Sequence, residues 1–134
     1  MTKQVNKMGF GSLRVNKVSD DMAEVFLYGD IGSWGDGLSA DDFARELKSL
    51  KVTDITARIN SGGGSVFEGQ AIYNSLVNHP AKVNVVIDGI AASIASVIAM
   101  AGDNISITEG SHIMVHKPWS MAMGDANSMR KEAE

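Results

Sequence analysis

The sequence predicts an α/β fold with largely parallel, buried strands. A unit of strand, glycine-rich turn and helix occurs twice between residues 54 and 102, and short strands follow it. Such alternation places strands side by side in parallel and covers them with helices. A length of 134 residues, with 44% hydrophobic and 21% charged residues, suits one globular domain with its own core. We therefore expect a single domain over residues 1–134.

The first elements are indicated by alternation and capping. Apolar residues alternate over 23–27, which predicts a strand, and the stretch 29–37 after it holds four glycines. Ser39 occupies an N-cap position, and apolar residues then recur at helical spacing over 40–50. This region is predicted to form a strand, a loop and a helix.

The remaining elements repeat that order. A β-branched strand is predicted over 54–59, and a helix over 66–78 comes after its glycine turn. A second strand is predicted over 83–87, followed by an Ala-rich buried helix starting near Ser93. Three further elements are predicted beyond it: strands at 105–108 and 112–116 and a helix over 121–134.

The composition excludes several classes of function. A net charge of −4 without a basic patch argues against nucleic acid as a partner. The absence of cysteine removes disulfides, thiolate nucleophiles and cysteine-based zinc sites. The longest uncharged run, 89–102, is shorter than the roughly 20 residues that span a bilayer, and the N-terminus lacks a signal-type apolar core. We expect a cytoplasmic protein with no membrane partner, no metal and no cofactor.

Three features are candidates for chemistry, and each is weak alone. The triple glycine 62–64 comes after a strand, but the lysine of a phosphate loop is absent and Phe67 stands where a dinucleotide site needs glycine. A serine that opens a helix, such as Ser93, is more often a cap than a nucleophile. Its small neighbours nevertheless allow close backbone approach, and the helix start offers free N–H groups.

The histidines do not form a metal site by spacing. His112 and His116 lie on one predicted strand, where about 3.3 Å per residue separates them by roughly 13 Å. His79, at the end of a predicted helix, is interpreted as a cation near the negative end of the helix dipole. His116, at the end of the same predicted strand, can serve either structure or catalysis.

The three features together resemble a known family. The segments RINSGGGSV (58–66), GIAAS (89–93) and HIMVH (112–116) resemble, in this order, motifs of the Clp protease proteolytic subunit. The intervals, 93 − 64 = 29 and 116 − 93 = 23, are similar to the family's spacing. The resemblance runs from about Leu27 onward and implies a ClpP/crotonase-like spiral of strand-turn-helix units.

The resemblance implies a serine endopeptidase and assigns its residues. Ser93 would be the nucleophile and His116 the general base and then acid, while the N–H groups of Gly64 and Ile94 would form the oxyanion hole. Gly62 stands where the family usually has proline, which leaves the next two glycines in place.

The family's third catalytic residue is an aspartate several dozen residues beyond the histidine. This sequence continues only 134 − 116 = 18 residues past His116, so we expect the C-terminal part of the domain to be missing. Asp125 is interpreted instead as a carboxylate at the start of the last helix. Loss of the orienting aspartate lowers turnover by roughly 10⁴, so weak or no activity is expected.

The resemblance also implies partners. Extended polypeptide would bind along 65–67 and 118–120, the chain would self-associate into rings, and an ATPase unfoldase would be a further partner. Segments 29–35 and 116–119 are similar to phage head-maturation proteases, which implies a scaffold or capsid protein as substrate and the host cytoplasm as location.

Three alternatives stay open at this point. The chain could be a non-catalytic, ring-forming assembly protein with the same fold. It could instead be a crotonase-like acyl-CoA enzyme, in which glycine-turn amides also form an oxyanion hole. A Ser-Lys dyad, with Lys117 or Lys82 as the base of Ser93, is the third.

Overall fold

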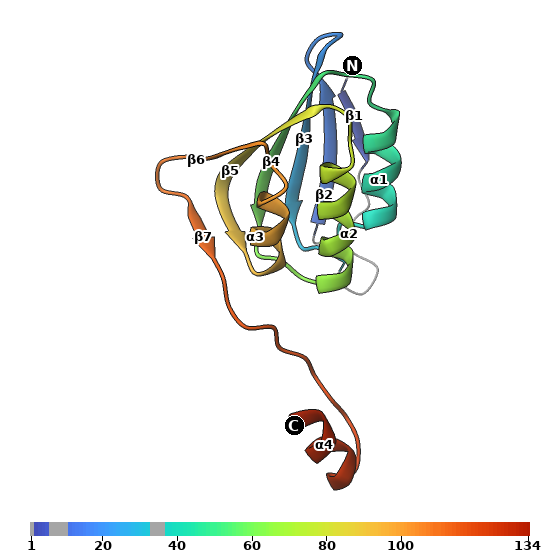
Figure 1. Cartoon of the computed structure of the whole chain (residues 1–134), viewed down its shortest axis with the longest axis vertical. Helices are drawn as coiled ribbons and strands as arrows, with labels where there is room; N and C mark the ends of the chain where they lie inside the picture. Colours follow the sequence, from blue (N-terminus) through green and yellow to red (C-terminus); the bar gives the residue numbers. More distant parts are fainter. Residues whose placement is uncertain (1, 6–10, 33–36) are drawn as a thin grey trace.

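The computed structural model describes residues 2–5, 11–32 and 37–134. In this part of the chain, strands and helices alternate from β3 to β6 after an N-terminal strand pair, and β7 and α4 follow (Figure 1). The elements are β1 (Thr2–Val5), β2 (Gly11–Lys17), β3 (Met22–Gly29), α1 (Ala40–Ser49), β4 (Asp54–Ser61), α2 (Val66–Val77), β5 (Lys82–Ala92), α3 (Ile94–Ala99), β6 (Asn104–Ile107), β7 (His112–Met114) and α4 (Ala126–Ala133).

The described strands form one mixed sheet in the order β1-β2-β3-β4-β5-β6, and β7 also pairs with β5. The pairs β3–β4, β4–β5, β5–β6 and β5–β7 are parallel, whereas β1–β2 and β2–β3 are antiparallel. The predicted α/β fold is therefore confirmed. The antiparallel strands β1 and β2 were not predicted, because only Leu13 and Val15 in β2 are apolar and this pattern is too short to identify a strand.

The helices α1, α2 and α3 lie on the same face of the sheet (Figure 1). Alternate strand residues point toward these helices and are almost fully buried, for example Leu27, Ile59 and Ile87. Phe43 of α1 and Ile72 of α2 pack into the same core. Each such side chain contributes about 1.5–3 kcal/mol through burial. The layered core fixes the carboxyl ends of β3, β4 and β5 relative to one another.

The helices agree with their predicted positions where their caps are clear. Ser39 accepts a hydrogen bond from the N–H of Asp42 and caps α1, and Ser65 does the same for α2 through the N–H of Glu68. The last helix covers only residues 126–133 of the predicted 121–134, and all of its residues are exposed. The glycine-rich stretch predicted at 29–37 falls partly outside the described residues, which omit 33–36.

Two strand predictions were wrong in their extent. β5 extends beyond the predicted 83–87, through Asp88 and Gly89 to Ala92, and α3 then begins at Ile94, close to the predicted start near Ser93. β7 ends at Met114, so His116 lies beyond the strand rather than at its end. Every residue of β6 and β7 is exposed, unlike the buried strands that the pattern predicted. Among the described residues, no helix is long and apolar enough to cross a membrane.

The sheet face opposite the helices carries a network of aromatic and charged side chains. The Arg14 guanidinium lies 3.9 Å from the centre of the Phe26 ring, which meets Tyr28 edge to face. The Tyr28 hydroxyl donates to Asp88 (2.6 Å), and Arg58 donates to both carboxylate oxygens of Asp88 (2.9 and 2.6 Å). This network joins β3, β4 and β5 near their carboxyl ends.

Burial by itself would raise the pKa of Asp88, but the hydrogen bonds from Arg58 and Tyr28 and the charge of Arg58 outweigh it and hold that pKa below its usual 3.8. A carboxylate with a lowered pKa stabilises the fold at pH values above its ordinary pKa, and this contribution is lost as the pH falls through the lowered value.

We predict that Asp88→Asn lowers the free energy of unfolding at pH 7 by about 1.5–3 kcal/mol, since it removes charge-assisted hydrogen bonds from Arg58. The difference between parent and variant should shrink as the pH falls below 3.8. Urea denaturation over a pH series measures both effects. Asp41→Asn is the matched control, because its ion pair with Arg45 is exposed and should contribute less than about 1 kcal/mol. Equal losses in the two variants would contradict the role of the network.

Candidate functional site

The backbone at Ser93 forms a sharp turn between β5 and α3. Its φ of 55° and ψ of −129° make it the one non-glycine residue with positive φ among those described. A side chain in this conformation costs of order 1–3 kcal/mol and is retained only where the surroundings enforce it. The Ser93 hydroxyl does not cap α3, so the common role of a helix-opening serine is not the one observed.

A bulge in β5 leads the chain into this turn. Ile59 pairs with Ile87 and Ser61 with Ala91, so three residues of β5 face the single residue Asn60 of β4. The Asn60 side-chain oxygen accepts a hydrogen bond from the Ile90 N–H (3.2 Å) and satisfies a group that the ladder leaves unpaired. A bulge bends its strand and redirects the chain beyond it, so this one re-aims the end of β5 toward the glycine turn.

The glycine turn after β4 packs directly against Ser93. A Cβ placed on Gly63 would lie 2.8 Å from both the Ala92 carbonyl oxygen and the Ser93 Cβ. A Cβ on Gly64 would lie 2.1 Å from the Ile31 carbonyl oxygen. Both glycines also have positive φ (97° and 148°). Only glycine satisfies both the conformation and the space at these two positions.

The turn is held in place by Ser61 and by the segment after β3. Buried Ser61 donates its hydroxyl proton to the Gly29 carbonyl (2.6 Å) and accepts from the Gly63 N–H (3.1 Å). The Ile31 N–H donates to the Gly63 carbonyl, and the Ser65 N–H donates to the Ile31 carbonyl (2.9 and 2.8 Å). These bonds fix the turn before any ligand binds.

His116 reaches Ser93 because β7 pairs with the end of β5. Ala92 is the register partner of Met114, and the Ser93 N–H donates to the Met114 carbonyl (2.9 Å). Two residues later, His116 Nε2 lies 2.7 Å from Ser93 Oγ. This distance is within the range for proton transfer from a hydroxyl to an imidazole base.

Two amide groups lie next to the serine. Ile94 is the first residue of α3, so its N–H has no partner within the helix. The Gly64 N–H donates to no other backbone group among the described residues. The Cβ position of Gly63 is 3.3 Å from the Ile94 nitrogen, so the turn and the start of α3 are adjacent. Of the two predicted oxyanion donors, Gly64 therefore belongs to the turn and Ile94 to the helix start that the turn contacts.

Ser93, His116 and the glycine turn line a cleft of about 680 Å³, and Ile94 is not among its lining residues. Its walls are Asp30, Gly32, Gly62, Gly63, Gly64, Ser65, Val66, Ser93, Met114, His116, Pro118 and Trp119. Both segments expected to border an extended peptide, 65–67 and 118–120, contribute residues to it. The predicted serine, histidine and glycine turn thus come together from β4, β5 and the segment after β7.

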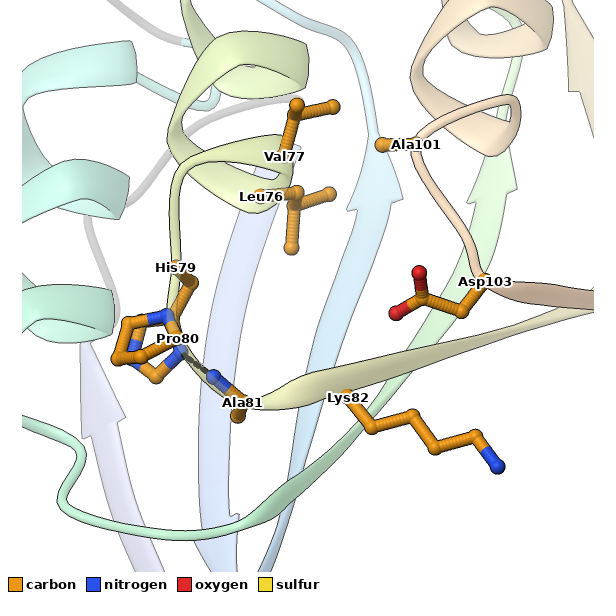
Figure 2. Close-up of a pocket in the computed structure, with 8 residues that line it drawn as sticks. All are labelled: Leu76, Val77, His79, Pro80, Ala81, Lys82, Ala101 and Asp103. Atoms are coloured by element: carbon orange, nitrogen blue, oxygen red, sulfur yellow. Dashed lines mark hydrogen bonds between the residues drawn. The ribbon is translucent and has the colours of Figure 1, made fainter.

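A second pocket lies at the other end of β5 (Figure 2). His79 Nδ1 accepts a hydrogen bond from the Ala81 N–H (3.0 Å), and Asp103 accepts from the Val83 N–H (2.8 Å). His79 therefore lies just beyond the end of α2, where its ring contacts the chain that enters β5, and its role as a cation stays a prediction. Because Lys82 begins β5 at this end, it is remote from Ser93 and does not serve as its base.

The described residues offer neither a third catalytic residue nor a metal site next to Ser93 and His116. Asp125 caps α4 by accepting from the Ser128 N–H (2.9 Å), and this backbone hydrogen bond lowers the pKa of its carboxyl group. Among the described residues, Ser93 is the one hydrogen-bond partner of the His116 ring. No group of three histidine or acidic side chains among the described residues could hold a metal ion.

Sequence reasoning missed the supporting residues Asn60, Ser61 and Asp30. Asn60 and Ser61 lie inside the segment that carries the family resemblance, but their hydrogen bonds depend on the bulge and on β3. Asp30 lies in the segment compared with phage proteases, of which residues 33–35 are outside the described residues. Its place in the cleft results from the pairing of Ile31 with the glycine turn.

Comparison with known proteins places this chain in a family. The Clp protease family model matches residues 16–134. The proteolytic subunit of the ATP-dependent Clp protease from Ligilactobacillus salivarius is 41% identical over 83 residues, which are 60% of this chain and 42% of that protein. The subunit from Bacteroides fragilis is 38% identical over 105 residues, which are 74% of this chain and 51% of that protein.

Solved structures of Clp protease subunits have a similar fold. ClpP1 from Listeria monocytogenes has a TM-score of 0.65 at 29% identity, over 81% of this chain and 64% of that one. Its N165D mutant has a TM-score of 0.63 at 31% identity, over 71% and 56%. The chain spans about half the length of the curated relatives that it matches. From the family match and the fold, this chain belongs to the Clp protease family.

Proposed function

We propose that the chain carries the nucleophile and the general base of a serine endopeptidase. The observation that carries this proposal is the 2.7 Å contact between His116 Nε2 and Ser93 Oγ, made at a serine whose strained backbone is enforced by the glycine turn. Strained conformations cluster at functional sites, and the hydroxyl here is used for neither a helix cap nor a core contact.

The proposed reaction uses the four predicted residues. His116 Nε2 takes the proton of Ser93 Oγ as the oxygen attacks the peptide carbonyl carbon, and the oxyanion accepts hydrogen bonds from the N–H groups of Gly64 and Ile94. The C–N bond then breaks, and the imidazolium returns its proton to the leaving amine. Water, deprotonated by the same imidazole, hydrolyses the acyl-serine ester and regenerates Ser93.

The rate depends on how His116 is oriented. In triads of this kind, a carboxylate on the second imidazole nitrogen fixes the tautomer, and its loss costs roughly 10⁴ in turnover. No carboxylate among the described residues makes that contact. We propose that this chain reacts slowly, and that covalent labelling of Ser93 is a better assay than peptide turnover.

We propose polypeptide as the substrate, bound extended along the cleft between Ser65–Val66 and Pro118–Trp119. The relatives are subunits of an ATP-dependent protease, so self-association into rings and an ATPase unfoldase partner are proposed here as well. Exposed apolar side chains on β7 and after it, such as Ile113 and Val115, support self-association.

A role in phage head maturation is a narrower proposal. Its support is sequence likeness in residues 29–35 and 116–119, and it would make a scaffold or capsid protein the substrate in the host cytoplasm. The family match does not favour the crotonase-like alternative. Covalent labelling of Ser93 distinguishes the peptidase from a non-catalytic assembly role, which predicts no labelling.

A fluorophosphonate should label Ser93, since this reagent reacts with a serine activated by a base. We expect Ser93→Ala to abolish labelling and His116→Gln to slow it by about 10²–10⁴-fold. Intact mass and peptide mapping identify the modified residue. Ser49→Ala, at an exposed serine of α1, is the control and should label like the parent. A folded parent chain that shows no labelling would point to the assembly role.

The glycine turn provides a second test. Gly63→Ala should reduce the rate of labelling and destabilise the fold by about 1–3 kcal/mol, because the added methyl group meets Ser93 and Ala92 and the backbone has positive φ. Gly62→Ala, in the same turn, adds a methyl group where nothing lies within 4 Å and should change little. Labelling rates and urea midpoints of the two variants check this. Similar behaviour of both would contradict a specific contact between the turn and Ser93.

A further inference from the structure

We infer that Asp30 makes the cleft selective for a peptide with a lysine or arginine side chain next to the scissile bond. The inference rests on the proposed function, and it names the class of substrate that the site prefers. Asp30 lines the same cleft as Ser93 and His116.

The backbone fixes Asp30 at the cleft. Its carbonyl accepts a hydrogen bond from the Leu38 N–H (2.8 Å), and the next residue, Ile31, exchanges two hydrogen bonds with the glycine turn. Asp30 is therefore tied to the turn that packs against Ser93. Its place on the wall does not depend on a contact made by its own carboxylate.

Other carboxylates near the glycine turn are already occupied. Glu68 accepts a hydrogen bond from the Ala40 N–H (2.7 Å), and Asp88 is bonded to Arg58 and Tyr28. The Asp30 carboxylate makes no hydrogen bond or ion pair with any described residue, although the residue is half-buried. A partly desolvated carboxylate gains most from a cationic partner that donates hydrogen bonds to it. Asp30 is thus the group available to a ligand.

The composition of the cleft wall points to the same ligand. No lysine or arginine is among the lining residues, and Asp30 is the one carboxylate among them. Trp119 also lines the cleft with 76% of its surface exposed, and an indole ring attracts a cation placed over its face. The net charge of −4 further disfavours acidic peptides. A cationic side chain is the one that this wall recognises.

A pair of peptidyl phosphonate diphenyl esters tests the inference. One carries a lysine side chain next to the phosphorus and the other carries norleucine, which lacks the ammonium group. Ser93 Oγ forms a bond to phosphorus, phenoxide leaves, and His116 receives the serine proton. We expect the lysine ester to react about tenfold faster than the norleucine ester, and this ratio to fall in about 1 M salt.

Asp30→Asn should bring the ratio of the two rates close to one, because it keeps the shape of the side chain and removes its charge. Asp41→Asn is the matched control: it removes the same charge from an exposed site on α1 and should keep the ratio of the parent. A lysine preference that persists in Asp30→Asn would overturn the inference, as would equal rates in the parent.

The small neutral fluorophosphonate separates this inference from the proposed function, because it carries no side chain for Asp30 to recognise. If that reagent labels Ser93 in the parent while the two esters react equally, the role of Asp30 is wrong and the peptidase proposal stands. If neither reagent type labels Ser93, both are wrong.

Discussion

The contact between the glycine turn and the backbone at Ser93 is the constraint on which the rest of the site depends. Gly63 approaches Ala92 and Ser93 more closely than any side chain would permit. Because the turn fills this space, the serine is held in a conformation that only glycine adopts readily. The same contact places the glycine turn next to the first residue of α3, 3.3 Å from the Ile94 nitrogen to the Cβ position of Gly63.

The order of the sheet brings together segments that are far apart in the sequence. The parallel neighbours β3, β4 and β5 end at one edge, where the segment after β3 supports the glycine turn and β5 delivers Ser93. β7 then pairs with the bulged end of β5 rather than with β6, and carries His116 to the serine. On the opposite face, Arg58 and Asp88 join the same strands, so stability and site geometry share one set of elements.

The sequence predicted the α/β class, the principal helices and the meeting of glycine turn, serine and histidine, because these depend on short motifs in a fixed order. It did not predict β1 and β2, whose pairing is set by tertiary context. The bulge opposite Asn60 was also missed, because a register shift leaves no periodic signal. The place of Asp30 in the cleft was missed as well, although segment 29–35 was singled out, because it depends on the backbone pairing of the neighbouring Ile31 with the glycine turn.

The most direct measurement is a crystal structure of the chain with a phosphonate bound covalently to Ser93. We expect the phosphoryl oxygen to accept hydrogen bonds from the Gly64 and Ile94 nitrogens at about 2.7–3.1 Å, with His116 Nε2 still next to the serine oxygen. An adduct on another residue, or a phosphoryl oxygen that points away from both amides, would contradict the assignment of this site.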